Sequence, residues 1–504
     1  MNIRSPALPP PAARRASVLV GLLWCVTVVS VVVIGLLHST RLDLRVVKNQ
    51  GDSIQAYYLA LAGIEKAKAL IYRDAGERKR AARNHTGELY NAPQHFRDIP
   101  LGRGQFRVFR QGRRDEGGGI LYGISDEESR LNLNQASAPE LGKLEGMTTN
   151  VLTAILDWRD EDNEPSPGGA EAEYYISLPS PRLPRNGPFQ TTRELLMVRD
   201  VPRDLFWGED TNQNGILDPE EDDGNESPPA DNQDGILDAG WSGMLTVDSA
   251  VQNKNAAGED RINVQTADEK TLAAVPGLSP ELARAIIAYR GQKQLETLAD
   301  LLDVAAVNRQ DNLQATPGRS AAQNNPPQTS SSSSSSGNSS GSSSGSSSGS
   351  ASGNSSRSAA GQSSSGGTPQ TSGPKLISDN LLMDIADDLM AGNASEEQPG
   401  AVNINTAGAD VLACLPGVTP ELAQAIISYR KSSGFFPNIA WLLKVDGMTH
   451  DIFQQMVGRV CARSETFRIL SEGKVGSTGA RKRLQAVVQL GAGEIVTLSW
   501  REDL

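Results

Sequence analysis

Histidine and cysteine are scarce in this sequence, and basic residues do not outnumber acidic ones. With four histidines and three cysteines in 504 residues, no nucleophile stands with a histidine or a phosphate-binding loop, so catalysis has no candidate. The net charge of -12 gives no general attraction to nucleic acid. The composition therefore favours neither an enzyme nor a general nucleic-acid binder.

The three cysteines occur in two settings. Cys25 is part of an apolar run, whereas Cys414 and Cys461 lie in or near the third of three repeats. The last two could form a disulfide in an oxidising compartment, but two buried thiols are the commoner outcome and are expected here.

One stretch occurs three times, at residues 131–159, 262–290 and 402–430. In every copy, the asparagine at the second position is followed by a glycine 14 positions later and an arginine 27 positions later. Apolar residues at helical spacing precede the glycine, which ends the first helix because it adopts a left-handed conformation at little cost. A Leu-Leu-x-Val tail after each copy is expected to close a small core. The repeat is therefore a helix-hairpin-helix motif.

The N-terminus carries a basic leader and a long apolar run. Arg4, Arg14 and Arg15 occur without an acid, and residues 16–37 contain 22 residues without a charge. This run is long enough to span a bilayer, and the preceding arginines predict a cytoplasmic N-terminus with the bulk of the chain exported. A cleaved secretory signal is the alternative, but residues 38–41 lack its small-x-small cleavage site. We therefore expect a retained anchor that continues as a helix to residue 72.

Strand patterns occur on both sides of the three repeats, at 105–110, 120–125, 466–470, 483–490 and 494–500. The simplest account is one sheet domain split by a helical insertion. Within the insertion, residues 308–373 are dominated by serine, glycine, asparagine and glutamine. Because this composition buries little apolar surface, it predicts a flexible linker between the second and third repeats. If one copy has a separate partner, it is then the third.

Residues 210–221 (DTNQNGILDPEE) match an EF-hand loop throughout. Oxygen ligands stand at positions 1, 3, 5, 9 and 12, with glycine at 6 and a carbonyl at 7, as calcium requires. A solvated acidic loop is the alternative, but such loops seldom reproduce both the glycine and the terminal glutamate. We expect calcium here, folding a loop with little core of its own. The predicted ligands are Asp210, Asn212, Asn214, Ile216, Asp218 and Glu221.

A second run repeats the middle of that pattern, with Asn232, Asp234, Ile236 and Asp238 as predicted ligands. Alanine and tryptophan occupy its positions 1 and 12. It is a calcium site only if neighbours such as Asp222 or Asp223 complete it.

A third polar group begins at the end of the first repeat and continues beyond it. Paired acids could serve hydrolysis, but no nucleophile or histidine accompanies them. We expect a structural cluster in which carboxylates hold an arginine. Its members are Asp157, Trp158, Arg159, Asp160, Asp162 and Glu171.

Several segments together carry a family resemblance. The arginine-rich leader, YYLALAGIEKAKALI, DEESRLNLNQAS, DWRDEDNEPSPGGAEAEYY, NGPFQTTRELLMV and IVTLSWRE resemble the general secretion pathway protein K family, the large minor pseudopilins of type II secretion. The resemblance implies a non-enzymatic subunit at the tip of a periplasmic pseudopilus, which initiates or caps its assembly. It also implies a sheet packed on the long N-terminal helix, and calcium binding near residues 210–238.

The resemblance further implies cleavage of the leader by a prepilin peptidase, here between Ala16 and Ser17. Major pilins carry a glutamate at the fifth mature position, where this chain has Gly21. An absent carboxylate fits a subunit that starts or caps the filament. The implied partners are other minor pseudopilins, the peptidase and the inner membrane, with secreted substrate or the outer-membrane secretin as further contacts.

The expected fold is α+β: a long N-terminal transmembrane helix on a small antiparallel sheet, split by a helical insertion. The expected order is leader 1–16, helix 17–72, first sheet part 73–129, insertion 130–307 with repeats 1 and 2 and the calcium loops, linker 308–375, repeat 3 at 376–462, and C-terminal strands 463–504. The chain should be single-pass in the inner membrane, with its bulk periplasmic.

The repeats offer a rival function, because helix-hairpin-helix motifs often bind DNA phosphates, as in membrane-anchored competence receptors. The three copies, however, have net charges of -1, 0 and -1. Phosphate binding depends on several basic contacts. Thr148, Ser279 and Thr419 also replace the second hairpin glycine of DNA binders. Nucleic acid is therefore not the expected partner.

Overall fold

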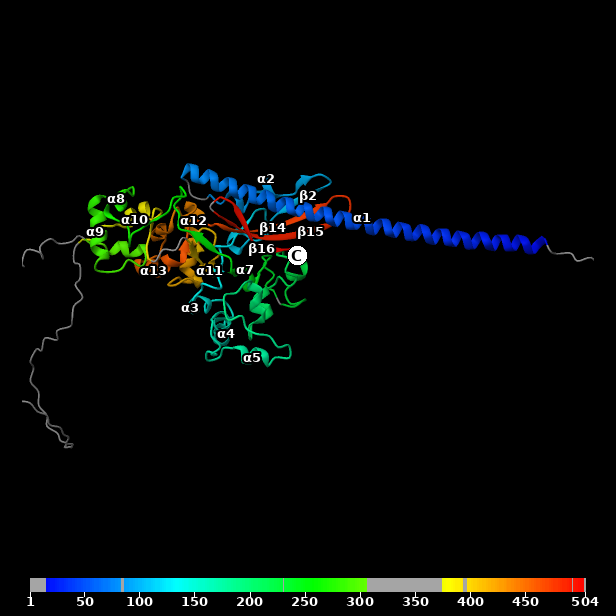
Figure 1. The fold of residues 1–504 in the computed structure, drawn as a ribbon, viewed down its shortest axis with the longest axis horizontal. Helices are drawn as coiled ribbons and strands as arrows, with labels where there is room; N and C mark the ends of the chain where they lie inside the picture. Colours follow the sequence, from blue (N-terminus) through cyan, green and yellow to red (C-terminus); the bar gives the residue numbers. More distant parts are fainter. Residues whose placement is uncertain are drawn as a thin grey trace, which may run out of the picture. The chain divides into compact units, whose positions relative to one another are not determined.

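The computed structural model describes residues 15–82, 86–229, 231–305, 374–392, 397–491 and 493–502, and Figure 1 shows their course. Two compact units are present, Met1–Val304 with Ile377–Leu504, and Ala305–Leu376. In the second unit, Ala305 forms an antiparallel bridge with Lys375. Leader residues 1–14 and linker residues 306–373 lie outside the described residues. The architecture below is that of the first unit.

Helix α1 (Arg15–Ala81) is continuous over 67 residues. Among the described residues it is the only helix long and apolar enough to cross a membrane, with a peak mean hydropathy of 2.7. Its side chains from residue 18 to 51 are exposed. The helix continues beyond the predicted end at residue 72, because ion pairs at i,i+4 spacing stabilise the added turns. These are Arg73 with Glu77 (3.7 Å) and Asp74 with Arg78 (2.9 Å).

One antiparallel sheet combines strands from before and after the helix-hairpin-helix units, as the strand patterns predict. Its order is β1-β2-β14-β15-β16, and β5 also pairs with β14. In the register, Val108 lies opposite Ser471 and Asp126 opposite Phe467. The chain thus leaves the sheet at Asp126 and returns at Thr466. The strands are β1 (Ile99–Leu101), β2 (Gly104–Val108), β5 (Ser125–Asp126), β14 (Thr466–Val475), β15 (Arg481–Leu490) and β16 (Ile495–Arg501).

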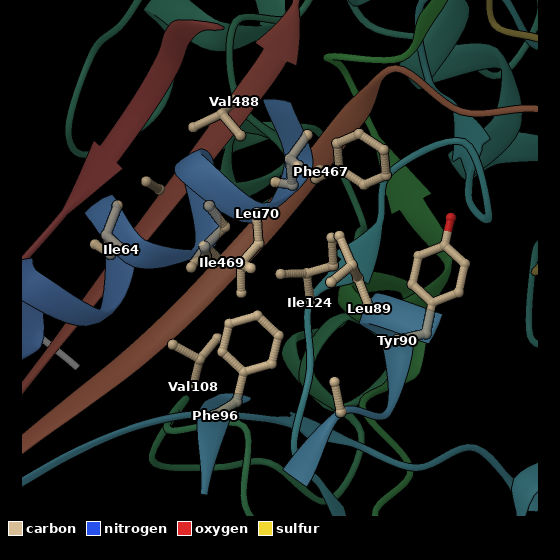
Figure 2. Packing of buried hydrophobic residues seen from close by; sticks show 14 of the residues in the cluster. Ile64, Leu70, Leu89, Tyr90, Phe96, Val108, Ile124, Phe467, Ile469 and Val488 are labelled. Atoms are coloured by element: carbon tan, nitrogen blue, oxygen red, sulfur yellow. The ribbon is translucent and has the colours of Figure 1, made fainter. Parts of the chain in front are cut away.

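The second half of α1 packs on this sheet. Ile64, Ala67 and Ile71 are spaced to face one side of the helix and are buried. Figure 2 shows Ile64 and Leu70 of α1 beside Ile469, with Val488, Phe467 and Val108 around them. The helix therefore belongs both to the apolar N-terminal segment and to the core of the sheet domain, which confirms the predicted fold class.

Three helix-hairpin-helix units lie between β5 and β14, and a two-residue parallel strand pair closes each. The first contains β6 (Leu131–Asn132), α3 (Ala138–Leu141), α4 (Thr149–Arg159), η3 (Thr192–Met197), α6 (Arg203–Trp207), α7 (Gly240–Met244) and β7 (Leu245–Thr246). The second contains β9 (Ile262–Asn263), α8 (Glu269–Ala273), α9 (Pro280–Arg290), η5 (Leu298–Asp303), α10 (Asp379–Ile385) and β10 (Leu389–Met390). The third contains β12 (Val402–Asn403), α11 (Ala409–Cys414), α12 (Pro420–Ser433), η7 (Ile439–Lys444), α13 (His450–Met456), η8 (Val457–Arg459) and β13 (Val460–Cys461).

Short elements complete the described residues. β3 pairs with β4, and β8 pairs with β11, both antiparallel. The elements are η1 (Glu88–Tyr90), α2 (Pro93–Phe96), β3 (Arg110–Gln111), η2 (Arg114–Glu116), β4 (Ile120–Leu121), α5 (Ala172–Ile176), η4 (Pro219–Glu221), β8 (Ala250–Gln252) and β11 (Glu397–Pro399).

The boundary predicted between linker and third repeat is wrong. Residues 379–390 complete the second unit, because Leu389 of β10 pairs with Ile262 of β9 and Ile385 of α10 lies against Gly277. The serine-rich segment therefore interrupts the second unit rather than separating the second from the third. The sequence does not indicate this, because the residues of α10 and β10 are not similar to any part of the repeated stretch.

The third copy does not stand apart from the other units beyond the linker. Lys143 of the first copy donates to the carbonyls of Ala413 (2.9 Å) and Leu415 (2.7 Å) at the end of α11. Arg459 of the third unit pairs with Glu140 of the first at 2.9 Å. The third copy is thus packed on the first. Cys414 and Cys461 are buried free thiols, as expected.

Three consecutive acids join the sheet to the repeats. Asp126 accepts hydrogen bonds from Asn403 (3.0 Å) and Ser464 (2.6 Å), and also from Thr406. Glu127 accepts from Thr246 of β7 at 2.6 Å and pairs with Arg468 of β14 at 2.5 Å. Glu128 accepts from the amide of Thr466. All three acids are buried, so residues 126–128 fix the first and third units against the sheet.

Glu128 should give the protein a pH-dependent stability. Burial, and then the neighbouring Asp126, raise its pKa well above the usual value. A carboxyl group whose pKa is raised by folding stabilises the folded protein fully below the unfolded pKa of about 4.3. This stabilisation is lost as the pH rises through the folded pKa. We expect the free energy of unfolding to fall as pH rises above about 4.3 in the wild type, and less steeply in Glu128→Gln. Urea unfolding across pH tests this, and equal slopes in both proteins would contradict it.

Candidate functional site

The asparagine and the arginine that recur in each copy form hydrogen bonds within their own unit. The last arginine of each copy donates from Nη1 to the carbonyl oxygen 26 positions earlier, at 2.7, 2.8 and 2.9 Å. The shared asparagine accepts from the amide two positions later, at 2.9, 2.8 and 2.9 Å. These bonds hold the second helix against the start of its own unit. The residues are Arg159, Arg290 and Arg430, and Asn132, Asn263 and Asn403.

Each hairpin glycine is covered by a helix of the same chain. Gly146, Gly277 and Gly417 have φ values of 71°, 96° and 72°, which confirms their left-handed conformation. A Cβ on them would lie 2.6 Å from a methyl carbon of Leu205 in α6, 3.2 Å from Ile385 in α10, and 3.0 Å from a side-chain oxygen in α13, respectively. The hairpin backbone, which a DNA-binding motif presents to phosphate, is therefore packed against side chains in all three copies.

The hydroxyls that replace the second hairpin glycine cap the next helix. Thr148, Ser279 and Thr419 each accept from the amide three positions later at 3.3 Å. This is the usual N-cap bond, so the substitution stabilises the helix start.

The loop at residues 210–221 brings its predicted ligands together. The side-chain amides of Asn212 and Asn214 donate from Nδ2 to Oδ2 of Asp218 at 2.9 and 2.6 Å. Asp210 accepts from the backbone of Asn214 at 2.9 Å, and Gly215 turns the chain with a φ of 70°. Asn214 Oδ1 accepts from the amide of Ile216 at 2.7 Å. The loop thus has the turn that an EF-hand requires at position 6.

A buried carboxylate lies at each end of this loop. Asp210 is 6% exposed and Glu221 is 5% exposed. Burial, and then the charge of Glu221, raise the pKa of Asp210 to about 6, against the opposing effect of backbone amides. The donors at positions 1, 3, 5, 9 and 12 are oxygen-bearing, and Ile216 has a backbone carbonyl at position 7. This donor set fits calcium, which prefers carboxylate, amide and carbonyl oxygens.

The second loop is less well suited to a cation. Asp234 pairs with Arg114 at 2.9 Å, which places a positive charge at the expected site. Of the two residues expected to complete the loop, Asp222 accepts from the amide of Gly235 at 3.3 Å, whereas Asp223 bonds to Ser227. The second site stays a prediction.

The acidic cluster differs from its prediction. Arg159 bonds to the carbonyl of Leu133 and makes no ion pair with Asp157, Asp160 or Glu171, all of which are described. The interpretation of an arginine held by carboxylates is therefore wrong. The aromatic part is packed as expected, because Trp158 lies edge-on to Tyr175 at 5.1 Å, and Trp158 is 2% exposed. Asp162 is exposed and accepts from the amide of Glu164 at 2.8 Å.

Several oxygens of the remaining carboxylates have no hydrogen-bond partner among the described residues. No described group bonds to Oδ1 of Asp157, Oδ1 of Asp160 or either oxygen of Glu171, although these atoms are buried. Burial, and then the charges of Asp160 and Asp157, raise the pKa of Glu171 to about 7. Sequence analysis grouped these acids but did not predict their unpaired oxygens, because it expected them to hold Arg159, which bonds to a carbonyl instead.

Taken together, the fold and the repeats define an α+β protein with a long apolar N-terminal helix and a sheet split by helix-hairpin-helix units. A family model for protein K of the type II secretion system (T2SS) matches residues 129–207, and a helix-hairpin-helix model matches residues 258–317 and 398–461. In these residues the chain is similar to the type II secretion system protein K family.

Similar proteins include the type II secretion system protein K of Pseudomonas aeruginosa, which is 27% identical over 202 residues, covering 36% of this chain and 56% of that protein. The protein K of Klebsiella pneumoniae is 26% identical over 175 residues, covering 31% and 48%. The chain spans about half the length of these curated relatives. ComE operon protein 1 of Bacillus subtilis is 37% identical over 62 residues, covering 12% of this chain and 30% of that protein.

Among solved structures, the GspK-GspI-GspJ complex from the enterotoxigenic Escherichia coli type 2 secretion system aligns over 92% of this chain and 98% of that one. The identity is 11% and the TM-score 0.37, at which the overlay does not establish a common fold.

Proposed function

We propose that the chain is a minor pseudopilin of the type II secretion system. It acts at the tip of the periplasmic pseudopilus and initiates or caps its assembly, for protein export across the outer membrane. The observation that carries the proposal is α1, whose uncharged start continues into the core of a split sheet domain, in a chain whose residues 129–207 match the protein K family model. An anchor shared with the core of the exported domain suits a filament subunit better than a simple tether.

The start of α1 supports a terminal position. In major pilins, a carboxylate at the fifth mature position pairs with the amino terminus of a neighbouring subunit. Counted from Ser17, this position holds Gly21, and residues 16–37 contain no charge at all. A subunit at the tip has no subunit above it, so it needs no such pair and avoids burying a charge in lipid.

The outer strand of the sheet supports contact with other subunits. β16 lies at an edge of the sheet. Val496, Leu498 and Trp500 on it are 44%, 40% and 36% exposed. An open apolar edge strand is a template for assembly. The proposed partners are other minor pseudopilins, with prepilin peptidase and the inner membrane at the N-terminus. Secreted substrate and the outer-membrane secretin are proposed contacts of the periplasmic part.

Deleting the gene in its host tests the proposed role. If the chain initiates assembly, exported protein in the medium and sedimentable pseudopilus filaments both fall. If it only caps, export falls while filaments lengthen. Restoration by the wild-type chain is the control, and unchanged export in the deletion strain contradicts the proposal.

DNA binding is not favoured, although the chain is 37% identical to ComE operon protein 1 over 62 residues. The three hairpins are covered by α6, α10 and α13, and the copies carry no net positive charge. A salt-sensitive gel shift at micromolar DNA with the full chain in detergent would support the rival function instead.

We also propose that the loop at 210–221 binds calcium and is folded by it. Asp210→Ala with Glu221→Ala removes both buried carboxylates, so we expect it to bind one calcium fewer than the wild type and to lose part of the calcium-dependent rise in melting temperature. The matched control is Glu220→Ala, an exposed acid of the same loop. Calorimetric titration and melting with and without chelator check this. A doubly substituted protein that binds as much calcium as the wild type contradicts the proposal.

A further inference from the structure

Helix α1 carries a basic stripe between its uncharged start and the sheet. Arg41, Arg45 and Lys48 are exposed, and the described residues provide none of them with an ion-pair partner. Intervals of four and three residues place the three side chains on one face of the helix, and the same spacing continues to Asp52 and Gln55. The stripe and these two residues therefore face the same side of α1.

Two turns of the sheet contact that face of α1. Thr478, in the turn between β14 and β15, donates to Asp52 at 2.9 Å. Arg103, in the turn between β1 and β2, donates to Gln55 at 3.0 Å. The amide of Gly476 donates to the carbonyl of Arg103 at 3.2 Å and so joins the two turns. In Figure 1, β15 lies beside α1 where the helix leaves the sheet. The turns thus extend the basic stripe sideways from the helix.

The two turns are also positively charged. Residues 38–55, 98–104 and 474–482 together carry seven basic and three acidic side chains, although the whole chain has a net charge of -12. One of the three acids, Asp52, is buried. We call the exposed basic residues of this region the basic face, which consists of Arg41, Arg45, Lys48, Arg103, Arg481 and Lys482.

The basic face follows directly on the apolar start of α1. Residues 16–37 form about 33 Å of helix, enough to fill the roughly 30 Å hydrocarbon core of a bilayer. Arg41 then lies about 6 Å beyond the core, at the depth of the headgroups, and Asp52 lies about 22 Å beyond it along the helix. Because α1 is continuous, the basic face is held beside the membrane whenever the anchor is inserted.

We propose that the basic face docks on the surface of an anionic membrane, with α1 inclined toward that face. Lysine and arginine are attracted to anionic headgroups over a Debye length of about 8–10 Å. Membrane helices tilt by up to about 40°, and a tilt toward the basic face lowers the two turns toward the headgroups. Docking then holds the unassembled subunit close to the membrane.

An acidic protein surface is the other partner that this charge fits. The membrane is favoured because it is already present at Arg41 in the anchored chain. Docking on it therefore requires only a change in tilt, whereas a separate protein loses translational and rotational freedom when it binds.

The test places a fluorophore on the turn between β14 and β15 and measures its quenching by spin-labelled headgroups. Ser477→Cys, an exposed position of that turn, carries the label in a Cys25→Ala background, whose other two cysteines are buried. The full chain is reconstituted in nanodiscs of phosphatidylcholine, alone or with about one third phosphatidylglycerol. We expect strong quenching only in the anionic discs, and its loss as salt rises from about 0.05 to 0.5 M.

The decisive variant neutralises the turns with Arg103→Gln, Arg481→Gln and Lys482→Gln. Each basic residue near an anionic surface contributes about fivefold, so the ratio of docked to undocked chain should fall by on the order of 100-fold. The matched control removes the same charge from exposed positions elsewhere and should quench as the parent does. Its substitutions are Arg80→Gln, Arg203→Gln and Lys431→Gln. All six positions are exposed, so both variants should fold alike.

Equal quenching in neutral and anionic discs, or equal quenching of the turn variant and its control, overturns the proposal. A turn variant that keeps its quenching but no longer co-purifies with other minor pseudopilins would identify an acidic protein as the partner, and overturns it as well. The inference rests on α1 crossing a membrane and not on the secretion role. Unchanged export after gene deletion would therefore leave the quenching result standing.

Discussion

Replacing Gly473 by alanine is expected to lower the free energy of unfolding by about 3 kcal/mol. Gly473 lies in β14, where the backbone of α1 passes close to the strand. A Cβ there would collide with the carbonyl oxygen of Ala56 and lie 2.6 Å from the amide nitrogen of Ala60 and 2.7 Å from Cβ of Leu59. These are largely backbone atoms of a rigid helix, which cannot rotate away as a flexible side chain can.

Gly458→Ala is the matched control for Gly473→Ala, because an added Cβ there meets no atom within 4 Å. Denaturant unfolding of the full chain in detergent measures both. A Gly473→Ala protein as stable as the control would show that α1 does not pack on β14 as described. It would then remove the physical link between the apolar segment and the exported sheet.

Asp126→Ala should cost a similar amount, about 3–5 kcal/mol, because it leaves several buried donors without an acceptor. The side chains of Asn403, Thr406 and Ser464 all donate to Asp126, and all three are buried. The loss should be concentrated between the sheet and the third unit. Limited proteolysis should therefore cut near residues 397–405 earlier than in the wild type.

Asp98→Ala is a suitable control for Asp126→Ala, since Asp98 is an exposed acid beside the same sheet. Unfolding curves and proteolysis rates that match in the two variants would contradict a role for Asp126 as the junction. They would also restore the possibility that the third unit is joined to the sheet only through its chain connections.

Much of this fold could be predicted from local patterns. The uncharged run at 16–37 predicts the helix, alternating residues predict β14, β15 and β16, and the repeat spacing predicts three hairpins with left-handed glycines. These features depend on residues close together in the chain. The same holds for the loop at 210–221, whose ligand positions are read from consecutive residues.

The long-range arrangement could not be predicted in this way. Ile385 and Leu389 complete the second unit from beyond the serine-rich segment, and no periodicity connects them to Gly277. Lys143 reaches the end of α11 in the third copy, which is a contact between distant residues. Glu171 is unpaired because Arg159 points elsewhere. The carbonyl to which Arg159 donates is known only from the folded chain.

The central claim is that this chain is a pseudopilin, and the N-terminus of the mature protein tests it most directly. The full-length chain is isolated from membranes of cells with an active prepilin peptidase and from cells without one, and its N-terminal peptide is identified by mass spectrometry. The account predicts a chain that begins at Ser17 in the first case and at Met1 in the second. Recovery of an intact Met1 from membranes with the active peptidase would contradict it.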